Sequence, residues 1–408
     1  MTAPREHDLV LFGVTGFVGR LTAAYVAEHA PPGLRVALAG RTRGKVEDVR
    51  AELPAAAHDW PVLVADTSDP ASLAAMAAAT RVVVSTVGPY LRHGLPVVGA
   101  CARNGTHYAD LTGEVPFVRR AIDRYDEVAR ASGARVVHAC GYDAVPSDLA
   151  VHVLHRRVEA DGAGALRDVR TVATARGGVS GGTVASMRGV VEQAAKDARV
   201  RRLLADPYAL SPDRGAEPAL PQPPDSPLPG RTHDGAWVAA SPMASFNTRV
   251  VRRSNALTGW SYGRSMRYGE VAGTGRGARG AAAALALTAA LPALVGVVAL
   301  PPTRALLDRV LPASGEGPDE ETRRTGRFRM EVHAVTTTGR QYRALAQGDG
   351  DPGYAATAVM LGESALALAL DGDRLPDRAG SLTPATGIGD ALVERLRAAG
   401  HTYEASPR

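Results

Sequence analysis

The sequence predicts an α/β fold, in which a doubly wound parallel sheet is joined to a second α+β domain. Two observations support this prediction. Over residues 7–141, short apolar runs typical of buried strands alternate with stretches of helical periodicity, which is the pattern of a parallel sheet covered on both faces. Beyond residue 148 the pattern changes to an alternating strand, a glycine turn and a proline-rich stretch, which indicates a second domain.

The first domain is expected to span residues 1–148, with strands and helices in strict alternation. The expected strands lie at residues 7–13, 34–40, 60–66, 81–88, 107–113 and 134–141. The expected helices begin near residue 17 and continue at residues 43–53, 70–79, 95–105 and 115–133. Parallel strands require crossover connections of this kind.

The second domain is expected to span residues 149–370 and to be inserted before a C-terminal region, residues 371–408. Its expected elements are a strand at 168–178, a helix at 182–204, a surface loop or flap at 207–230, a hairpin at 327–348 that turns at Gly339, and a helix at 353–372. In the C-terminal region, residues 387–400 form a helix that is expected to return to the first domain.

A glycine turn stands between the first expected strand and the first expected helix. In LVLFGVTGFVGRL (residues 9–21), the glycines are spaced three apart. Such a turn lets backbone N–H groups and the positive end of a helix approach a phosphate closely. Because a strand precedes it and a run of βα units follows, we predict a Rossmann-type dinucleotide site. The residues expected to contact the cofactor there are Gly13, Thr15, Gly16, Phe17, Val18 and Gly19.

The end of the second strand selects the cofactor. NAD-binding domains carry an acidic residue there for the ribose hydroxyls, whereas this chain has Arg41 and Thr42, followed by Arg43 and Lys45. A guanidinium suits the 2′-phosphate of NADP, so we predict NADP(H), with Arg41 and Thr42 as contacts. The alternative is that these residues form only the solvated start of a helix.

Two further strand ends complete the predicted cofactor site. Asp66 ends the third strand, where it can meet the adenine or cap the helix that follows at Pro70. The motif STVGPY (residues 85–90) ends the fourth strand, and ligands of doubly wound sheets lie beyond the carboxyl ends of the strands. We therefore expect the ribose and nicotinamide to run beside Thr86, Val87, Gly88 and Pro89.

Composition argues against several other classes of protein. The net charge is +5, without a basic block, so no nucleic-acid partner is expected. Cys101 and Cys140 are the only cysteines, too few for a disulfide framework or a zinc cluster. The histidines are scattered without metal-ligand spacing, so no metal site is expected. We expect a cytoplasmic protein, because no signal peptide precedes the first strand.

One apolar stretch suggests contact with lipid. Residues 281–302, AAAALALTAALPALVGVVALPP, carry no charge and are about long enough to cross a bilayer core, which takes roughly 20 residues. Alanine dominates the stretch and Pro292 interrupts it. Three interpretations stay open: a membrane span, a helix in the membrane interface, or burial in a core or at a lipid-substrate site.

Motifs along most of the chain resemble a known family. In order, these motifs are GVTGFVGR, LAGRT, STVGPY, GTHYADLTGE, CGYDAVPSDL, GGT, PDEETR with RF following, GDPGY and LTPATGIGDALVERL. As a set they resemble the saccharopine dehydrogenase-like oxidoreductases, and within these the trans-acting enoyl reductases of actinobacteria.

The resemblance implies an NADPH-binding Rossmann domain and a second domain inserted before a C-terminal helix. It implies reduction of an enoyl double bond on a long polyketide-derived acyl chain, a thioester supplied by a polyketide synthase or an acyl carrier protein. The products in this branch are lipids of the phthiocerol and glycolipid type. Association with the inner face of the plasma membrane is also implied, and the apolar stretch agrees with it.

Enoyl reduction needs a hydride at the β-carbon, a donor to the thioester carbonyl and a proton for the α-carbon. Candidate donors follow the fifth and sixth strands, in GTHYADLTGE and CGYDAVPSD. We predict Tyr142 as acid or carbonyl donor and Asp143 as the residue that orients it. Ser147 and Asp148, which are further candidates, have the alternative role of capping a helix that begins near residue 149.

The sequence also bears on other mechanisms and functions. The Tyr-x-x-x-Lys pair of short-chain reductases is excluded, because neither lysine, Lys45 or Lys196, follows a tyrosine at that spacing. A second glycine-rich helix entry, residues 175–189, could hold a phosphopantetheine phosphate or form a tight interdomain turn. The alternative functions are a saccharopine-type reductase acting on a C–N bond of a polar substrate, and a membrane-associated NADPH-binding scaffold without turnover.

Overall fold

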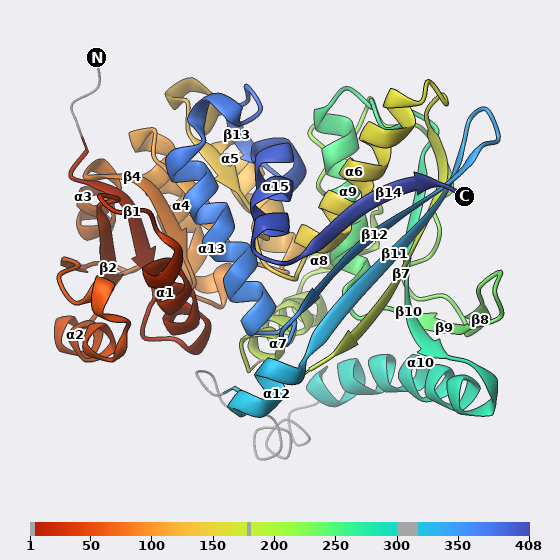
Figure 1. Cartoon of the computed structure of the whole chain (residues 1–408), viewed down its shortest axis with the longest axis horizontal. Coiled ribbons are helices and arrows are strands. Elements are labelled where there is room, and N and C mark those ends of the chain that lie inside the picture. Colours follow the sequence, from red (N-terminus) through yellow and green to blue (C-terminus); the bar gives the residue numbers. More distant parts are fainter. Residues whose placement is uncertain (1–4, 178–180, 300–316) are drawn as a thin grey trace.

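Two seven-stranded sheets lie side by side in the computed structural model of this chain (Figure 1). The structure describes residues 5–177, 181–299 and 317–408. The first sheet and its helices occupy the left of the view and contain the N-terminal residues. The second sheet occupies the right, where the C-terminus lies at the tip of its outermost strand, β14.

The first sheet is parallel throughout its described strands, in the order β13-β6-β5-β4-β1-β2-β3. Leu9 of the central strand lies opposite Val36 on one side and Val82 on the other. This arrangement confirms the predicted doubly wound sheet. The strands are β1 (His7–Phe12), β2 (Val36–Gly40), β3 (Val62–Val64), β4 (Thr80–Ser85), β5 (His107–Asp110), β6 (Arg135–Val137) and β13 (Gly380–Leu382).

Helices cover both faces of the first sheet, because alternate residues of its strands point to opposite sides. In β1, Leu9 and Leu11 join one apolar core, while Val10 and Phe12 join the other. One face carries α1 (Phe17–His29), α2 (Arg43–Glu52) and α13 (Ala355–Leu370), with the short turns η1 (Ala55–Ala57) and η2 (Gly372–Arg374). The other carries α3 (Pro70–Ala78), α4 (Tyr90–Asn104) and α5 (Val115–Ser132).

The second sheet is mixed, in the order β14-β12-β11-β7-β10-β9-β8. The predicted hairpin is present: β11 pairs with β12, and Gly339 turns it with φ +83°. Alternate residues of β11 are buried on the side that faces α6 (Val145–Ala160). The strands are β7 (Leu166–Arg176), β8 (Gly230–Arg231), β9 (Trp237–Ala240), β10 (Arg267–Gly275), β11 (Arg327–Thr336), β12 (Gln341–Asp349) and β14 (Thr402–Pro407).

The remaining helices surround the second sheet and the junction between the sheets. The single helix expected at residues 182–204 is two helices, because Asp197 accepts a hydrogen bond from Arg199 N (2.7 Å) and caps a new helix. These helices are α7 (Gly181–Lys196), α8 (Ala198–Ala205), α9 (Ala244–Leu257), α10 (Gly277–Ala299), α12 (Glu320–Thr325), α14 (Pro384–Gly387) and α15 (Asp390–Ala398).

The C-terminal region takes part in both sheets. β13 adds a parallel strand to β6 of the first sheet, and α15 packs against α13 on that sheet. The chain then continues as β14, which pairs with β12 of the second sheet. The sequence predicted the returning helix but neither strand. The division of the chain at residues 148 and 370 stays a prediction, and α13, expected in the second domain, contacts α1 and β4.

The proline-rich segment 207–230 is a loop fixed from below by α9. Three arginines of this helix, Arg249, Arg252 and Arg253, are buried. Arg252 and Arg253 donate to the backbone carbonyls of Pro207 and Leu210 at 3.0 and 2.6 Å, and Arg249 donates to Asp225 Oδ2 at 2.5 Å. The segment is therefore a loop anchored on α9, and of the two predicted forms, surface loop or flap, these contacts favour the loop.

The apolar stretch 281–302 begins within α10, and residues 300–302 lie outside the described part. α10 packs on β9, β10 and α7, with Ala284 buried. Its outer side is exposed, and Leu285 is 62 % accessible to solvent. Burial of the stretch in a core is therefore wrong for residues 281–290. In the described part of the chain, no helix combines the length and apolar character that a membrane crossing needs.

Candidate active site

The glycine turn after β1 is shaped by two close approaches. Gly13 has φ +98°, and a Cβ there would lie 2.8 Å from Thr86 Oγ1. At Gly19 a Cβ would lie only 2.4 Å from the carbonyl oxygen of Gly13. Gly16 N donates to that same oxygen at 3.0 Å and closes the turn. A turn this tight therefore requires glycine at positions 13 and 19.

The N-terminus of α1 is open toward solvent. Gly16 is the N-cap residue, and in the described part of the chain no side chain caps the helix. Thr15 is exposed, and Phe17 and Val18 are partly exposed. The first N–H groups of a helix need acceptors, and a phosphate supplies them while it meets the positive end of the helix dipole.

The end of β4 lies beside this turn, as predicted. Thr86 Oγ1 donates to the carbonyl oxygen of Gly13 at 3.0 Å, which ties the two strand ends together. Val87 and Pro89 are partly exposed, and Gly88 is exposed. Thr86–Pro89 thus forms one wall of the space above the glycine turn.

The end of β2 presents positive charge to solvent. Arg41 and Thr42 are exposed, and Arg41 is close enough to Asp66 to help lower the pKa of that carboxyl. The larger cause of the lowered pKa is Ser68, whose backbone N–H and hydroxyl both donate to Asp66 Oδ1 (2.9 and 2.8 Å). The N-cap of α3 is Asp69, so the alternative role of Asp66 as that cap is wrong.

Tyr142 and Asp143 stand at the end of β6, and both are partly exposed. The Tyr142 ring meets Phe328 edge-on, with centroids 5.6 Å apart. Its backbone N–H donates to Thr357 Oγ1 at 3.0 Å. Burial raises the pKa of the Tyr142 phenol, and the carboxylates of Glu270 and Asp143 add to the effect. Among the described residues, no hydrogen bond joins Tyr142 to Asp143, so the geometry gives Asp143 no orienting role.

Asp143 has properties of its own that suit acid chemistry. Burial raises the pKa of its carboxyl to about 7, and the carboxylates of Asp110 and Glu114 contribute. Two glycines leave room for this carboxyl: a Cβ at Gly113 or Gly141 would lie 3.3 or 3.2 Å from its oxygens. A carboxyl with a pKa near neutrality is protonated in a large fraction of molecules at pH 7, so it can donate a proton.

The backbone that presents Asp143 is strained and well braced. Ala139 has φ +62°, a left-handed conformation that costs a residue other than glycine about 1 kcal/mol or more. Its N–H donates to Asp110 Oδ1 at 2.9 Å, and Asp110 Oδ2 lies 2.7 Å from His138 Nδ1. This buried pair joins the ends of β5 and β6, so Asp110 supports the site from below.

Glu114 links the start of α4 to α7. Its carboxylate accepts from the N–H groups of Tyr90 and Leu91 at the start of α4 (3.0 and 2.7 Å) and from Ser186 Oγ of α7 (2.7 Å). Burial raises the pKa of this carboxyl. Glu114 thus holds α7 in place over the ends of β4 and β5, where this helix covers the site.

Ser147 and Asp148 do not cap a helix, because α6 begins at Val145. Ser147 Oγ donates to the buried carboxylate of Glu270 in β10 at 2.9 Å. Asp148 accepts from Ser254 Oγ (2.5 Å) and from Ala385 N (2.8 Å). Ser147 therefore ties the start of α6 to β10, and Asp148 ties it to α9 and α14, partners too distant along the chain to be inferred from the sequence.

The residues at the strand ends fit a bound dinucleotide. The cradle at Gly13 and Gly19 has no room for a Cβ, the N-terminus of α1 is open, and Arg41 is exposed at the end of β2. These three features match the needs of a pyrophosphate and a 2′-phosphate.

Comparison with known proteins agrees with this geometry. The family model of the saccharopine dehydrogenase NADP-binding domain matches residues 9–137. A Mycobacterium tuberculosis protein, provisionally named as a trans-acting enoyl reductase, is 51% identical over 98% of both chains. The trans-acting enoyl reductase of Mycobacterium ulcerans is 46% identical over 99% of both chains.

This chain belongs to the trans-acting enoyl reductase family. The match to the NADP-binding domain and the full-length relatives make it an NADP-dependent oxidoreductase, which confirms the predicted cofactor and class of enzyme. Saccharomyces cerevisiae saccharopine dehydrogenase (L-Glu forming) has the same fold, with a TM-score of 0.57 at 14% identity over 98% of this chain and 99% of its own.

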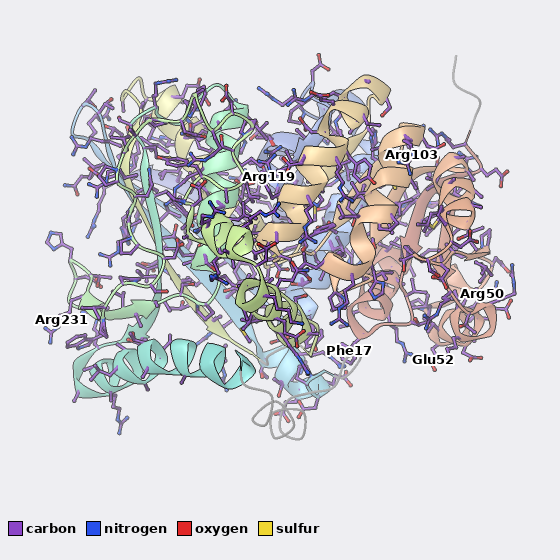
Figure 2. All side chains as sticks on the ribbon, turned by 180° about the vertical axis from the view of Figure 1, so that it is seen from behind. Phe17, Arg50, Glu52, Arg103, Arg119 and Arg231 are labelled. Atoms are coloured by element: carbon purple, nitrogen blue, oxygen red, sulfur yellow. The ribbon has the colours of Figure 1, made fainter. Side chains whose placement is uncertain are left out.

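The structure of this family member adds residues to the site that the sequence motifs did not indicate. The ring of Phe17 meets Tyr354 edge-on (centroids 4.7 Å apart), and Arg323 of α12 lies over it at 5.2 Å. Gly181 N, at the start of α7, donates to Tyr354 Oη at 3.2 Å. Figure 2 shows Phe17 beside α12. PDEETR and GDPGY therefore meet the glycine turn, although their sequence distance hides this.

Proposed function

We propose that this chain reduces the carbon–carbon double bond of a long-chain 2-enoyl thioester with NADPH. The observation that carries the proposal is the 46–51% identity, over nearly the whole chain, with proteins named as trans-acting enoyl reductases. An exposed guanidinium at the end of β2 and a carboxyl of raised pKa at the end of β6 support it.

The residues of the first sheet divide the work by position. Gly13, Thr15, Gly16, Phe17, Val18 and Gly19 would hold the pyrophosphate of NADP(H), Arg41 and Thr42 its 2′-phosphate, Asp66 its adenine, and Thr86–Pro89 the ribose and nicotinamide. When bound, NADPH supplies the hydride. The chain itself orients the acceptor over the end of β4, with α7 above to exclude water.

Asp143 is proposed as the proton donor for the α-carbon, and Tyr142 as the donor to the thioester carbonyl. From the sequence, Asp143 was expected only to orient Tyr142. The reason for assigning proton donation to Asp143 is the raised pKa of each group: near neutrality a carboxyl of pKa about 7 gives up a proton readily, whereas the Tyr142 phenol stays protonated and can only donate a hydrogen bond.

A lipid-like substrate and a membrane-associated location are further parts of the proposal. The exposed apolar side of α10, with Leu285 62 % accessible, supports contact with a lipid surface or an acyl chain. We propose that the substrate is a polyketide-derived acyl chain of glycolipid biosynthesis, presented by a carrier protein or synthase. The enzyme would then work in the cytoplasm at the inner face of the plasma membrane.

The experiment follows NADPH oxidation by the purified chain with a long-chain 2-enoyl thioester, with NADH as the cofactor control. We expect turnover with NADPH, little with NADH, and a saturated thioester by mass spectrometry. The saccharopine-type alternative would instead give turnover on a C–N substrate. Tight NADPH binding without turnover on either substrate would favour the scaffold and overturn the proposal.

A further inference from the structure

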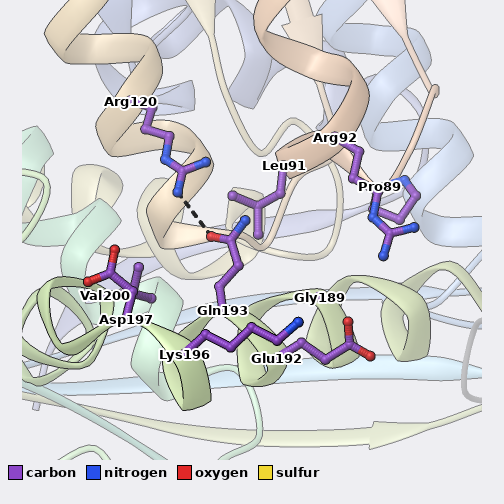
Figure 3. Close-up of a pocket in the computed structure, with 10 residues that line it drawn as sticks. All are labelled: Pro89, Leu91, Arg92, Arg120, Gly189, Glu192, Gln193, Lys196, Asp197 and Val200. Carbon is purple, nitrogen blue, oxygen red and sulfur yellow. Dashed lines mark hydrogen bonds between the residues drawn. The ribbon is translucent and has the colours of Figure 1, made fainter.

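A small cavity lies between α4, α5 and α7, next to the end of β4. Its volume is about 200 Å³, and its walls are apolar at Pro89, Leu91 and Val200. Figure 3 shows that Arg92, Arg120 and Lys196 reach into the space between these helices. Each of the three cations comes from a different helix, so the fold itself brings them together.

The three cations of this cavity form no ion pair with the two carboxylates of its lining, Glu192 and Asp197, in the described part of the chain. Glu192 accepts from Arg188 Nε at 3.1 Å, and Asp197 caps α8 by accepting from Arg199 N at 2.7 Å. Arg120 donates to the neutral amide oxygen of Gln193 at 3.1 Å. Throughout the described residues, no carboxylate lies within ion-pair distance of the three cations. Converging like charges repel one another, and an anion bound among them removes that repulsion.

The position of the cavity identifies which anion it suits. Pro89 lines the cavity and directly follows Thr86–Gly88, the proposed wall of the nicotinamide site. The 2′-phosphate of NADP belongs at Arg41, after β2, and β2 and β4 lie on opposite sides of β1. An anion in the cavity would therefore be distinct from the 2′-phosphate of NADP and would lie next to the proposed nicotinamide site.

We infer that this cavity binds the phosphate of a phosphopantetheine arm that carries the enoyl group. Arg92, Arg120 and Lys196 would hold the phosphate oxygens, and Pro89 and Leu91 would guide the arm toward the end of β4. The inference rests on the proposed function, because it assumes an enoyl thioester as substrate. It places the phosphate at α4, α5 and α7 and not at the glycine-rich entry 175–189.

The test compares one enoyl group on three carriers: an acyl carrier protein, coenzyme A, and pantetheine, which lacks the phosphate. The variant is Arg92→Gln with Lys196→Gln, two exposed positions that should not affect folding. The matched control is Arg124→Gln, an exposed arginine of α5 that does not line the cavity. The readout is the ratio of kcat/KM for each phosphate-bearing thioester to that for the pantetheine thioester.

We expect the double variant to lower this ratio by about 10- to 100-fold, which is the usual loss for a charged hydrogen bond, and the control to keep it. A loss with carrier protein and coenzyme A alike assigns the site to the shared phosphate. A loss with the carrier protein alone assigns the cations to the protein surface of the carrier and overturns the phosphate site. An unchanged ratio, or an equal loss on all three substrates, overturns the inference.

A binding measurement separates this inference from the proposed function. Calorimetric titration of phosphopantetheine and of pantetheine needs no turnover. If no thioester is reduced, but phosphopantetheine binds more tightly than pantetheine and the double variant removes the difference, the proposed function fails and the phosphate site stands. If thioesters are reduced while the two ligands bind equally, the phosphate site fails and the proposed function stands.

Discussion

In the first sheet every described strand pair is parallel, whereas in the second sheet only β7 and β10 run parallel and five described pairs are antiparallel. The first sheet has apolar cores on both faces. The second has alternate residues of β11 buried on one side and more exposed on the other. Parallel strands must be buried on both faces, while antiparallel strands tolerate water on one.

The two regions also hold their loops by different means. At the glycine turn, close contacts between backbone atoms shape the loop, and glycine stands where a side chain would clash. Around the second sheet, buried polar side chains hold the loops in place. Arginines of α9 bind loop carbonyls, and Glu270 accepts hydrogen bonds from Ser147, Ser241 and Asn247. The first arrangement leaves N–H groups free for a ligand. The second uses its donors to hold the protein together.

The largest expected effect is on the chemistry at the first sheet. Asp143→Asn should lower kcat by about 100- to 10,000-fold, the usual contribution of a general acid, with less change in NADPH affinity. Because the protonated carboxyl is the donor, wild-type kcat should fall as the pH rises through about 7. Steady-state kinetics between pH 5.5 and 9 measures both effects.

Tyr142→Phe is the comparison variant for Asp143→Asn. It keeps the ring contact with Phe328 and removes only the hydroxyl. A fall in kcat with an unchanged pH profile supports Tyr142 as carbonyl donor, and unchanged turnover removes it from the chemistry. If Asp143→Asn keeps both the rate and the pH limb near 7, Asp143 is not the proton donor.

Around the second sheet, the largest loss of stability is expected when a buried donor of α9 is removed. Arg253 donates to the carbonyl oxygens of Leu210 and Ser381 (2.6 and 2.5 Å), and so ties α9 to the proline-rich loop and to the first sheet. Arg253→Met leaves both oxygens unsatisfied, which should cost about 3 kcal/mol of unfolding free energy. Urea denaturation measures this. The exposed control Arg124→Gln should stay within about 0.5 kcal/mol of wild type.

A smaller effect, on NADPH affinity, is expected when a side chain is added where the turn has no room for a Cβ. Gly19→Ala places a Cβ 2.4 Å from the Gly13 carbonyl oxygen. Such overpacking costs about 1–3 kcal/mol, so NADPH should bind about 10- to 100-fold more weakly. Gly44→Ala is the matched control, because a Cβ there has no neighbour within 4 Å. Fluorescence titration with NADPH should leave the control near wild type. Equal affinity of both variants would show that the turn does not hold the cofactor.

The smallest predicted effect is the choice between cofactors. Arg41→Gln should weaken NADPH binding about 10-fold, the cost of one charged hydrogen bond, and should leave NADH binding as it is. Titration of both cofactors measures the difference. An equal loss of affinity for NADPH and NADH would mean that Arg41 supports the fold of the turn and does not bind the 2′-phosphate.

The first sheet was accessible to sequence reasoning because its signals are local. Apolar runs marked the strands, and the spacing of Gly13, Gly16 and Gly19 marked the turn next to them. The predicted end of β4 lies beside that turn through the Thr86–Gly13 hydrogen bond. The predicted pair of Tyr142 and Asp143 also stands at a strand end, although no hydrogen bond in the described part joins the two.

The contacts that complete the site could not be read from the sequence, because each joins distant segments. Phe17 meets Tyr354 and Arg323, and Ser147 meets Glu270. β13 and β14 are short strands whose pairing is decided by the sheets that they join. A buried arginine such as Arg253 has the same sequence signature as an exposed one, and only the folded chain supplies its carbonyl partners.

The most direct test of the account follows the hydride itself. The purified chain is given NADPH carrying two deuterium atoms at nicotinamide C4 and a long-chain 2-enoyl thioester, and the deuterium in the product is located by mass spectrometry and NMR. We expect one deuterium on the β-carbon and a solvent proton on the α-carbon of the reduced thioester. Asp143→Asn should form little of this product. Deuterium on the α-carbon, or no deuterium in a reduced product, would contradict the account.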